Sequence, residues 1–404
     1  MNNTLKVLTI LALVSANAYA GNDAKNLDKV VDDAIYVETN TPKINLSGYV
    51  DAGYIYNFTG SSGPQSSYGG VDTGGSGDFN LNAFKVVLEK PLSDKNEFQA
   101  GFRVDIMLGE DADALNTAGA ESGTSDSIYL QQAHVLIRVP VGNGLDLQVG
   151  KFGSILGFEA DERPANMNIT QGFNASLDPA PSTGILGTYP INDRLSIMGG
   201  VINGAGQSTN VGLDTTSDGY AFTGGLGLTN ESGNAETQLA YHAAPVGDAG
   251  LGQTENEPIM GLNWWGTWAP HCCKEKLLLA FNTSYWVAND FSTPAVDPAV
   301  DNSSNFYTVA LYAKYQFTEI FSLAGRAEYA HNDDNQLLGL AGRDPSFSDD
   351  VFSWTATAGF QLTEELLFRV EYRVDAGSNV VVDSTGTLTD DFANRVAAQV
   401  VYSF

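Results

Sequence analysis

Long apolar runs, basic residues and cysteines are all scarce in this sequence. Beyond residue 20, no apolar stretch approaches the ~18 residues that a transmembrane helix needs, so membrane spanning by helices is excluded. The 20 basic residues are outnumbered by 48 acidic ones, and binding to a nucleic-acid backbone is therefore not expected. The only two cysteines, Cys272 and Cys273, cannot supply the disulfide framework on which many small secreted domains depend.

The two cysteines are adjacent, which limits what they can do. Neighbouring Cα atoms lie about 3.8 Å apart, whereas disulfides usually join Cα atoms ~4.4–6.8 Å apart, so a bridge between them would be strained. With His271 they offer metal-ligating atoms, but a zinc site spaces its ligands and needs a fourth. An ordinary turn is the favoured interpretation, and no metal or cofactor is expected.

Residues 1–20 have the features of a secretory signal peptide. One lysine, Lys6, precedes a short apolar core over residues 7–14, and the sequence A-Y-A ends the segment as a small-residue cleavage site. The mature chain is therefore expected to begin near Gly21 and to leave the cytoplasm. Residues 21–43 are predicted to be a periplasmic N-terminal segment, either a short docked helix or a disordered tether.

From residue 44 onwards, apolar and polar residues alternate with the period of two that is typical of β-strands. In FSWTATAGFQL, residues 352–362, aromatic and apolar side chains alternate with serine, threonine, glycine and glutamine. About sixteen such segments follow one another up to residue 404, each of a length that fits a strand. Connections after even-numbered segments are short and those after odd-numbered segments are long, so all tight turns are predicted to lie on one side.

This asymmetry predicts an all-β fold: a transmembrane antiparallel up-and-down β-barrel over residues 44–404. It would have about 16 strands (14–18), with short periplasmic turns and long extracellular loops. A large secreted β-sandwich or β-helix would also show alternation. Mid-strand charges such as Arg369 and Glu371 need a wet face, which is the exterior of a sandwich or the lumen of a barrel. The signal peptide, the hairpin asymmetry and the last residue of the chain favour the barrel.

The chain ends in NRVAAQVVYSF, a strand pattern whose last residue is phenylalanine. Phe404, Tyr402 and Val400 fall on one face of this strand. The pattern resembles the C-terminal signal by which Gram-negative outer-membrane barrels are recognised by their assembly machinery. The resemblance implies the barrel-assembly machinery as a partner and a final position in outer-membrane lipid and lipopolysaccharide, where Phe404 would lie in an aromatic girdle.

A long polar segment follows the fifth predicted strand. Residues 154–182, within GKFGSILGFEADERPANMNITQGFNASLDPAPSTG, are too polar to form a strand and carry Glu159, Asp161, Glu162 and Arg163. The segment resembles the loop that folds into the lumen of general porins and makes their constriction. On this resemblance, the four charged residues are candidates for the lining of a constriction.

Further pore-lining candidates come from the polar register of the strands. They are Arg103, Asp105, Arg138, Arg326, Arg369, Glu371, Arg373 and Arg395. Barrel closure would gather the arginines into a basic arc, and acids on the infolded loop opposite this arc would create a transverse field across the channel. In the alternative, the charges pair locally, Arg103 with Asp105 and Arg369 or Arg373 with Glu371, and merely keep the lumen wet.

Nearly the whole mature chain is similar to the OmpL-like putative β-barrel porins. The similarity is carried by LSGYVDAGYIY, LQVGKF, GFE, PSTGILGTYPINDRLSIMGGVINGAG and the terminal strand. It implies an outer-membrane porin that passes small hydrophilic solutes or ions by passive diffusion, and the homotrimer that is usual for general porins. A structural or adhesive barrel with a closed lumen is an alternative. An outer-membrane hydrolase is a weaker one, because none of the four histidines lies in a G-x-S-x-G or H-E-x-x-H context.

Overall fold

The computed structural model describes residues 44–58, 77–117, 128–176, 178–179, 181–203, 220–245, 258–273, 276–288, 304–332, 349–382 and 388–404. The predicted signal peptide, residues 1–20, and the predicted periplasmic segment, residues 21–43, lie outside the described residues. The described elements, in chain order, are β1 (Asn45–Asn57), β2 (Asp78–Lys90), β3 (Gln99–Leu108), α3 (Glu110–Thr117), β4 (Ile128–Val139), β5 (Leu145–Phe152), η1 (Arg163–Ala165), η2 (Asn174–Ser176), β6 (Ser182–Pro190), β7 (Leu195–Asn203), β8 (Tyr220–Thr229), β9 (Ala235–Pro245), β10 (Pro258–Trp268), η3 (His271–Cys273), β11 (Leu277–Ala288), β12 (Ser304–Gln316), β13 (Phe321–Asn332), β14 (Asp349–Gln361), β15 (Leu366–Val382) and β16 (Leu388–Ser403).

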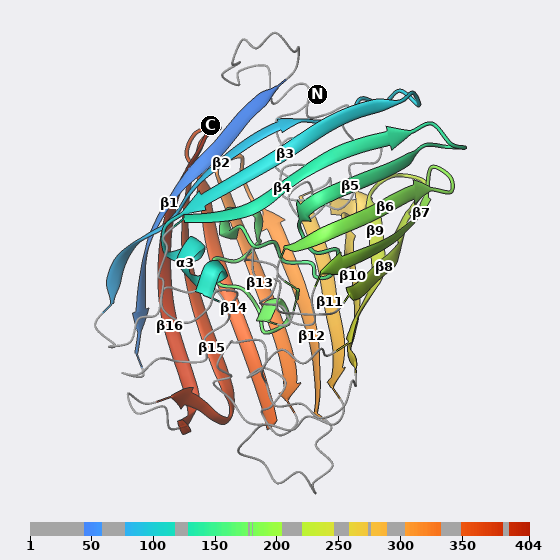
Figure 1. Ribbon diagram of the computed structural model, residues 1–404. Coiled ribbons are helices and arrows are strands. Elements are labelled where there is room, and N and C mark those ends of the chain that lie inside the picture. The colour runs from blue at the N-terminus through green and yellow to red at the C-terminus, as the bar shows by residue number, and fades with distance from the viewer. Residues whose placement is uncertain are drawn as a thin grey trace, which may run out of the picture.

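The strands close into one antiparallel barrel (Figure 1). Each strand pairs with its neighbours in sequence, and β16 pairs with β1 from Tyr49 opposite Ser403 to Asn57 opposite Arg395. Closure gives the backbone N–H and C=O groups of every strand a partner on both sides and leaves no open sheet edge. The predicted all-β antiparallel barrel of about sixteen strands is confirmed.

The two ends of the barrel differ in the length of their connections. The short turn over residues 362–365 lies beside the C terminus, since Leu366 pairs with Tyr402. By strand alternation, the other short turns share this end, whereas long connections such as residues 204–219 and 333–348 join strands at the opposite end. The connection between β15 and β16 is shorter than predicted, because both strands continue the ladder to residues 382 and 388.

Burial follows the predicted alternation of side chains. On β15, Arg369 and Arg373 are 4% and 0% exposed, whereas Val370 and Tyr372 are 38% and 43% exposed. The charged register therefore faces the interior and the apolar register faces outward, as expected from the strand period. Among the described residues, no helix combines the length and the apolar character needed to cross a bilayer.

The connection between β3 and β4 differs from its prediction as a loop, because it contains helix α3. Ala112 and Leu115 of α3 are buried and pack with Met107 of β3 and Ala83 of β2, and Figure 1 shows the helix inside the ring of strands. Its sequence, EDADALNT, is mostly polar and presents too few apolar residues for a clear helical period. The helix is therefore stabilised by its tertiary contacts rather than by its own sequence.

Candidate functional site

The interior of the barrel is crossed by the connection between β5 and β6. Residues 153–176 of this connection are called the infolded loop here. Gly157 turns the chain near its start with φ 92°, a conformation that favours glycine. Asn168, Thr170 and Asn174 in its second half are completely buried. The loop therefore occupies the interior as a packed element and not as a surface connection.

Apolar side chains fix the infolded loop against several parts of the wall. Three clusters join them: Ile155, Leu156 and Phe173 with wall residues such as Leu186, Trp286 and Phe306; Phe158 and Met167 with wall residues such as Trp265, Leu278 and Tyr312; and Ile169 with Ile55 and Ala397. Burial of one large apolar side chain contributes about 1.5–3 kcal/mol. Packing alone therefore gives the loop a preferred position.

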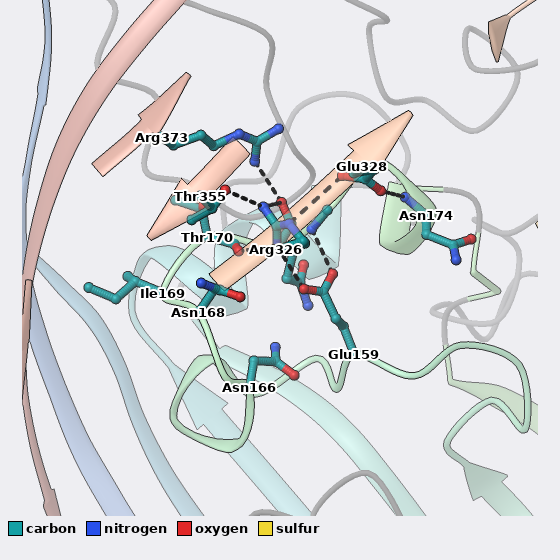
Figure 2. Close-up of polar contacts among 12 residues, drawn as sticks. Glu159, Asn166, Asn168, Ile169, Thr170, Asn174, Arg326, Glu328, Thr355 and Arg373 are labelled. Atoms are coloured by element: carbon teal, nitrogen blue, oxygen red, sulfur yellow. Dashed lines mark hydrogen bonds and ion pairs between the residues drawn. The ribbon is translucent and has the colours of Figure 1, made fainter. Parts of the chain in front are cut away.

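Arg326 of β13 is the central polar anchor of the loop (Figure 2). Its Nη1 donates to Oε1 of Glu159 at 2.7 Å and to the backbone oxygen of Thr170 at 2.6 Å. Its Nη2 donates to the backbone oxygen of Gln171 and to Oγ1 of Thr355, both at 3.2 Å. One wall arginine thus binds both an acidic side chain and the backbone of the loop.

Two arginines of β15 also donate to backbone oxygens of the loop. Arg369 reaches Asn166 with Nη1 at 2.7 Å and Arg163 with Nη2 at 2.8 Å. Arg373 reaches Gln171 with Nη1 at 2.7 Å. Guanidinium groups suit this role because they hold several N–H donors in a rigid plane. These side chains position the loop, and they do not stand free in an open lumen.

Wall carboxylates accept hydrogen bonds from the loop in the same region. Oε2 of Glu371 accepts from the amide of Ile169 at 2.5 Å, and Oε1 accepts from the amide of Thr170 at 3.0 Å. Oε1 of Glu328 accepts from the amide of Asn174 at 3.1 Å. Acidic wall groups therefore accept hydrogen bonds from the N–H groups of the loop, and basic wall groups donate hydrogen bonds to its C=O groups. Buried backbone groups need such partners.

The predicted local pairing is confirmed at one position and wrong at another. Arg103 binds Asp105 at 2.8 Å, as expected. Within the described residues, however, no ion pair joins Glu371 to either neighbouring arginine of its strand, and Arg373 binds Asp375 instead, at 2.8 Å. The reason is the loop, whose amides occupy the oxygens of Glu371.

A second set of charges holds the loop at β2 and α3, and β2 is separated from β15 only by β16 and β1. Glu162 forms an ion pair with Lys85 of β2, which also lies 3.0 Å from Asp105. Nη2 of Arg163 donates to Oδ1 of Asp111 in α3 at 2.6 Å, and both residues are 1% exposed. Burial disfavours the charged form of Arg163, but the Asp111 carboxylate outweighs this and leaves the pKa of Arg163 raised.

The structure divides the predicted pore-lining arginines into two groups. Arg326, Arg369 and Arg373 touch the loop, and Arg395 of β16 lies beside them, 3.6 Å from Asp375. Arg103 on β3 and Arg138 on β4, by contrast, bind acids of the wall, Asp105 at 2.8 Å and Asp146 at 2.7 Å. The predicted transverse field assumed acids and arginines separated by a channel.

The charges of the loop are instead in direct contact with the wall. Glu159 binds Arg326 and Glu162 binds Lys85, while Oδ2 of Asp161 accepts from Gln131 at 3.3 Å. These residues therefore do not form the predicted transverse field, because their charges are in contact and are not separated by an open gap. Their first effect is to determine where the loop lies.

Sequence reasoning missed several residues of this site. Lys85 and Asp111 were not singled out, nor was Asn263 of β10, whose Oδ1 accepts from the amide of Gly157 at 3.1 Å. Asn263 in turn donates to Oδ1 of Asn282 at 2.8 Å. Lys85 and the two asparagines stand in the polar register of their strands, so the alternation contained the signal for them. Asp111 had no such signal, because its helix was not predicted.

Comparison with known proteins gives a family and a fold. The family described as "Putative beta-barrel porin-2, OmpL-like" matches residues 43–404. No curated protein matches the sequence.

Solved structures of outer-membrane proteins share the barrel. The outer membrane channel DcaP of Acinetobacter baumannii is 14% identical with a TM-score of 0.62, over 92% of this chain and 100% of that one. OprB of Pseudomonas putida is 13% identical with a TM-score of 0.57, over 95% and 97%. OmpT of Vibrio cholerae, in a trimer form, is 10% identical with a TM-score of 0.55, over 90% and 99%. At these identities the similarity concerns the fold alone.

Proposed function

The chain belongs to the family described as putative beta-barrel porin-2, OmpL-like, and on that premise we propose that it is an outer-membrane porin. Small hydrophilic solutes or ions diffuse passively through its lumen, without catalysis and without a cofactor. A barrel of about sixteen strands is wide enough to enclose an aqueous channel. Family and fold both support a place in the outer membrane.

The infolded loop is the observation that supports this function most directly. It lies in the lumen and is fixed to β13 and β15 and, beyond the intervening strands β16 and β1, to β2 and α3. A solute that crosses the barrel has to pass between this loop and the wall. We propose that Glu159, Asp161, Glu162 and Arg163, together with the wall arginines, set the width and charge of that passage by fixing the loop.

A structural or adhesive barrel with a closed lumen is the second candidate. The dense packing of the loop favours it, because both the polar residue Asn168 and the apolar residue Ile169 are excluded from solvent. The two candidates differ in one property that can be measured, which is the flow of ions through a single barrel.

The purified, folded protein is expected to produce discrete conductance steps in a planar lipid bilayer, since ions would pass beside the loop. The control is the same preparation after heat denaturation, which should give no steps. Reversal potentials in a salt gradient then report ion preference. If folded protein enters the bilayer and gives no steps at any voltage or salt concentration, the porin proposal is wrong and the closed barrel is favoured.

The proposed partners follow from the same function. We propose insertion into outer-membrane lipid and lipopolysaccharide by the barrel-assembly machinery. The outward register of β16 supports this, since Val400, Tyr402 and Phe404 are 45%, 50% and 41% exposed. We also propose a homotrimer, supported by the trimer form of the structural neighbour OmpT.

Phe404 is expected to be the most sensitive residue of the assembly signal. Its backbone closes the seam with Gly48 through bonds of 2.9 and 3.0 Å, and its ring stacks against Phe84 with centroids 6.5 Å apart. Replacement by alanine removes the ring and an aromatic contact of about 0.5–1.5 kcal/mol. The Phe404→Ala variant should therefore yield less folded barrel in the outer membrane, measured as the heat-modifiable fraction on a gel.

Phe392→Ala is the matched control for this measurement. Phe392 lies on the same face of the same strand and is 49% exposed, so its replacement removes a similar apolar area far from the C terminus. Equal losses in the two variants would show that Phe404 acts only as lipid-facing surface and is not part of an assembly signal.

A further inference from the structure

The chain's two cysteines lie together on a turn that the proposed function does not use. Cys272 and Cys273 belong to η3, between β10 and β11, at the short-turn end of the barrel. Cys272 is exposed and Cys273 is partly exposed, and neither is in a disulfide. Their Sγ atoms are 3.3 Å apart. The structure thus presents two accessible sulfurs side by side.

Hydrogen bonds fix the turn that carries these sulfurs. The backbone N–H of Ala269 donates to the backbone oxygen of Asn234 at 2.8 Å, and Nδ2 of Asn234 donates back to the oxygen of Ala269 at 2.8 Å. The amide of Cys273 donates to the oxygen of Pro270 at 3.2 Å. The two sulfurs are therefore already positioned before a ligand binds. Binding would cost little conformational entropy of the turn.

The chemistry of the pair favours the reduced dithiol. A disulfide between adjacent residues would join Cα atoms about 3.8 Å apart, well below the usual ~4.4–6.8 Å. The hydrogen bond with Cys272 also raises the pKa of the Cys273 thiol, which slows its oxidation because the thiolate is the reactive form. Both cysteines therefore remain reduced thiols, which lose their protons when they bind a ligand.

We propose that Cys272 and Cys273 form a binding site for a soft, thiophilic ion held through two sulfurs, with trivalent arsenic as the best match. Thiolate ligands select soft ions. Tetrahedral zinc, with bonds of ~2.3 Å, would set the sulfurs about 3.8 Å apart and would need further ligands. Within the part of the chain that the structure describes, no group of three or more His, Cys, Asp or Glu side chains is placed to hold a metal.

Trivalent arsenic has the geometry that this pair offers. It binds sulfur with angles near a right angle, which brings two sulfurs closer together than a tetrahedral ion does. With an organic arsenic oxide, two As–S bonds form, the arsenic–oxygen bond breaks, and the oxygen leaves as water with the two thiol protons. Arsenic and sulfur keep their oxidation states, so no oxidant or reductant is needed.

Phenylarsine oxide is the probe that tests this site. The folded full-length protein, in detergent and without reductant, is mixed with the probe and its intact mass is measured. One adduct per chain is expected, and a small dithiol should remove it. The second As–S bond is intramolecular, so a monothiol should need at least about 100-fold higher concentration to strip the wild type than to strip a single-cysteine variant.

Cys272→Ser and Cys273→Ser are the matched variants, since each keeps one sulfur at an exposed turn. A heat-modifiable band on a gel shows that each is folded, and the Cys272→Ala/Cys273→Ala variant defines the background. The proposal is overturned if a monothiol strips wild type and single variants equally well, or if wild type binds the probe only after reduction. Neither result depends on channel conductance, so this proposal and the porin proposal succeed or fail separately.

Discussion

Replacement of Arg326 by methionine is expected to detach the centre of the infolded loop from the barrel wall. Arg326 lies between two buried carboxylates: its Nη1 is 2.7 Å from Glu159, and its Nε is 3.8 Å from Glu328. These carboxylates hold the loop amides of Gly172 at 2.6 Å and Asn174 at 3.1 Å. Without the guanidinium, both negative charges would stay buried without their cation and would repel each other.

Loss of one partner from a buried ion pair costs about 3–5 kcal/mol. Since about 1.4 kcal/mol corresponds to a tenfold change, amide hydrogen exchange at Gly172 and Asn174 should speed up at least about 100-fold. Single channels of the variant should also become larger or noisier, because the freed loop would no longer hold one position. Exchange is measured by mass spectrometry and conductance in planar bilayers.

Two further variants make the Arg326→Met result specific. Arg138→Met carries the same change on the inner wall, where Arg138 binds Asp146 and no part of the loop, and loop exchange should stay as in wild type. The Arg326→Met/Glu159→Gln/Glu328→Gln variant removes the buried charges and should recover part of the protection. Unchanged exchange at Gly172 and Asn174 in Arg326→Met would mean that apolar packing alone holds the loop.

Strand periodicity accounts for what the sequence could predict. Side-chain direction in a strand follows from register alone, so the inward face of β15, with Arg369 and Arg373, could be assigned without coordinates. The same alternation places Lys85 inward, between the outward neighbours Phe84 and Val86. The barrel itself followed from the asymmetry of the connections, which reflects the closed antiparallel topology.

The partners of these side chains could not be predicted in the same way. Arg326 and Glu159 are 167 positions apart in sequence, and their contact depends on the path of a loop that has no periodic signal. Glu371 is an example of a side chain whose partner was predicted wrongly for this reason. Its neighbours along the strand are arginines, but the loop amides compete successfully for its oxygens. Contacts with an irregular segment are set by three-dimensional packing, which the local sequence does not encode.

The buried pair of Asp111 and Arg163 connects α3 with the infolded loop. Nε of Arg163 donates to Oδ1 and Oδ2 of Asp111 at 2.9 Å, and Nη2 donates to Oδ1 at 2.6 Å. The backbone oxygen of Arg163 meanwhile accepts from Arg369 of β15. Through this pair, α3 determines how the first half of the loop is placed relative to β15.

Asp111→Ala is therefore expected to free the first half of the loop while the second half stays anchored. The variant leaves a buried guanidinium without its carboxylate, at a cost of about 3–5 kcal/mol. Exchange should speed up at least about 100-fold at Ala165 and Asn166, whose amides bond within η1, and should stay slow at Gly172 and Asn174. This is the reverse of the pattern expected for Arg326→Met.

The control for Asp111→Ala is Glu110→Ala, which removes an exposed acid from the same first turn of α3 and so alters the helix dipole to a similar degree. The Asp111→Ala/Arg163→Met variant tests the cause, since removal of the buried, unpaired charge should return part of the lost protection against exchange.

If exchange in Asp111→Ala rises equally in both halves of the loop, the anchors at Asp111 and Arg326 act as one cooperative unit. A pore of fixed width would then require all of these contacts together, and the charges on α3 would set that width as much as those on the loop.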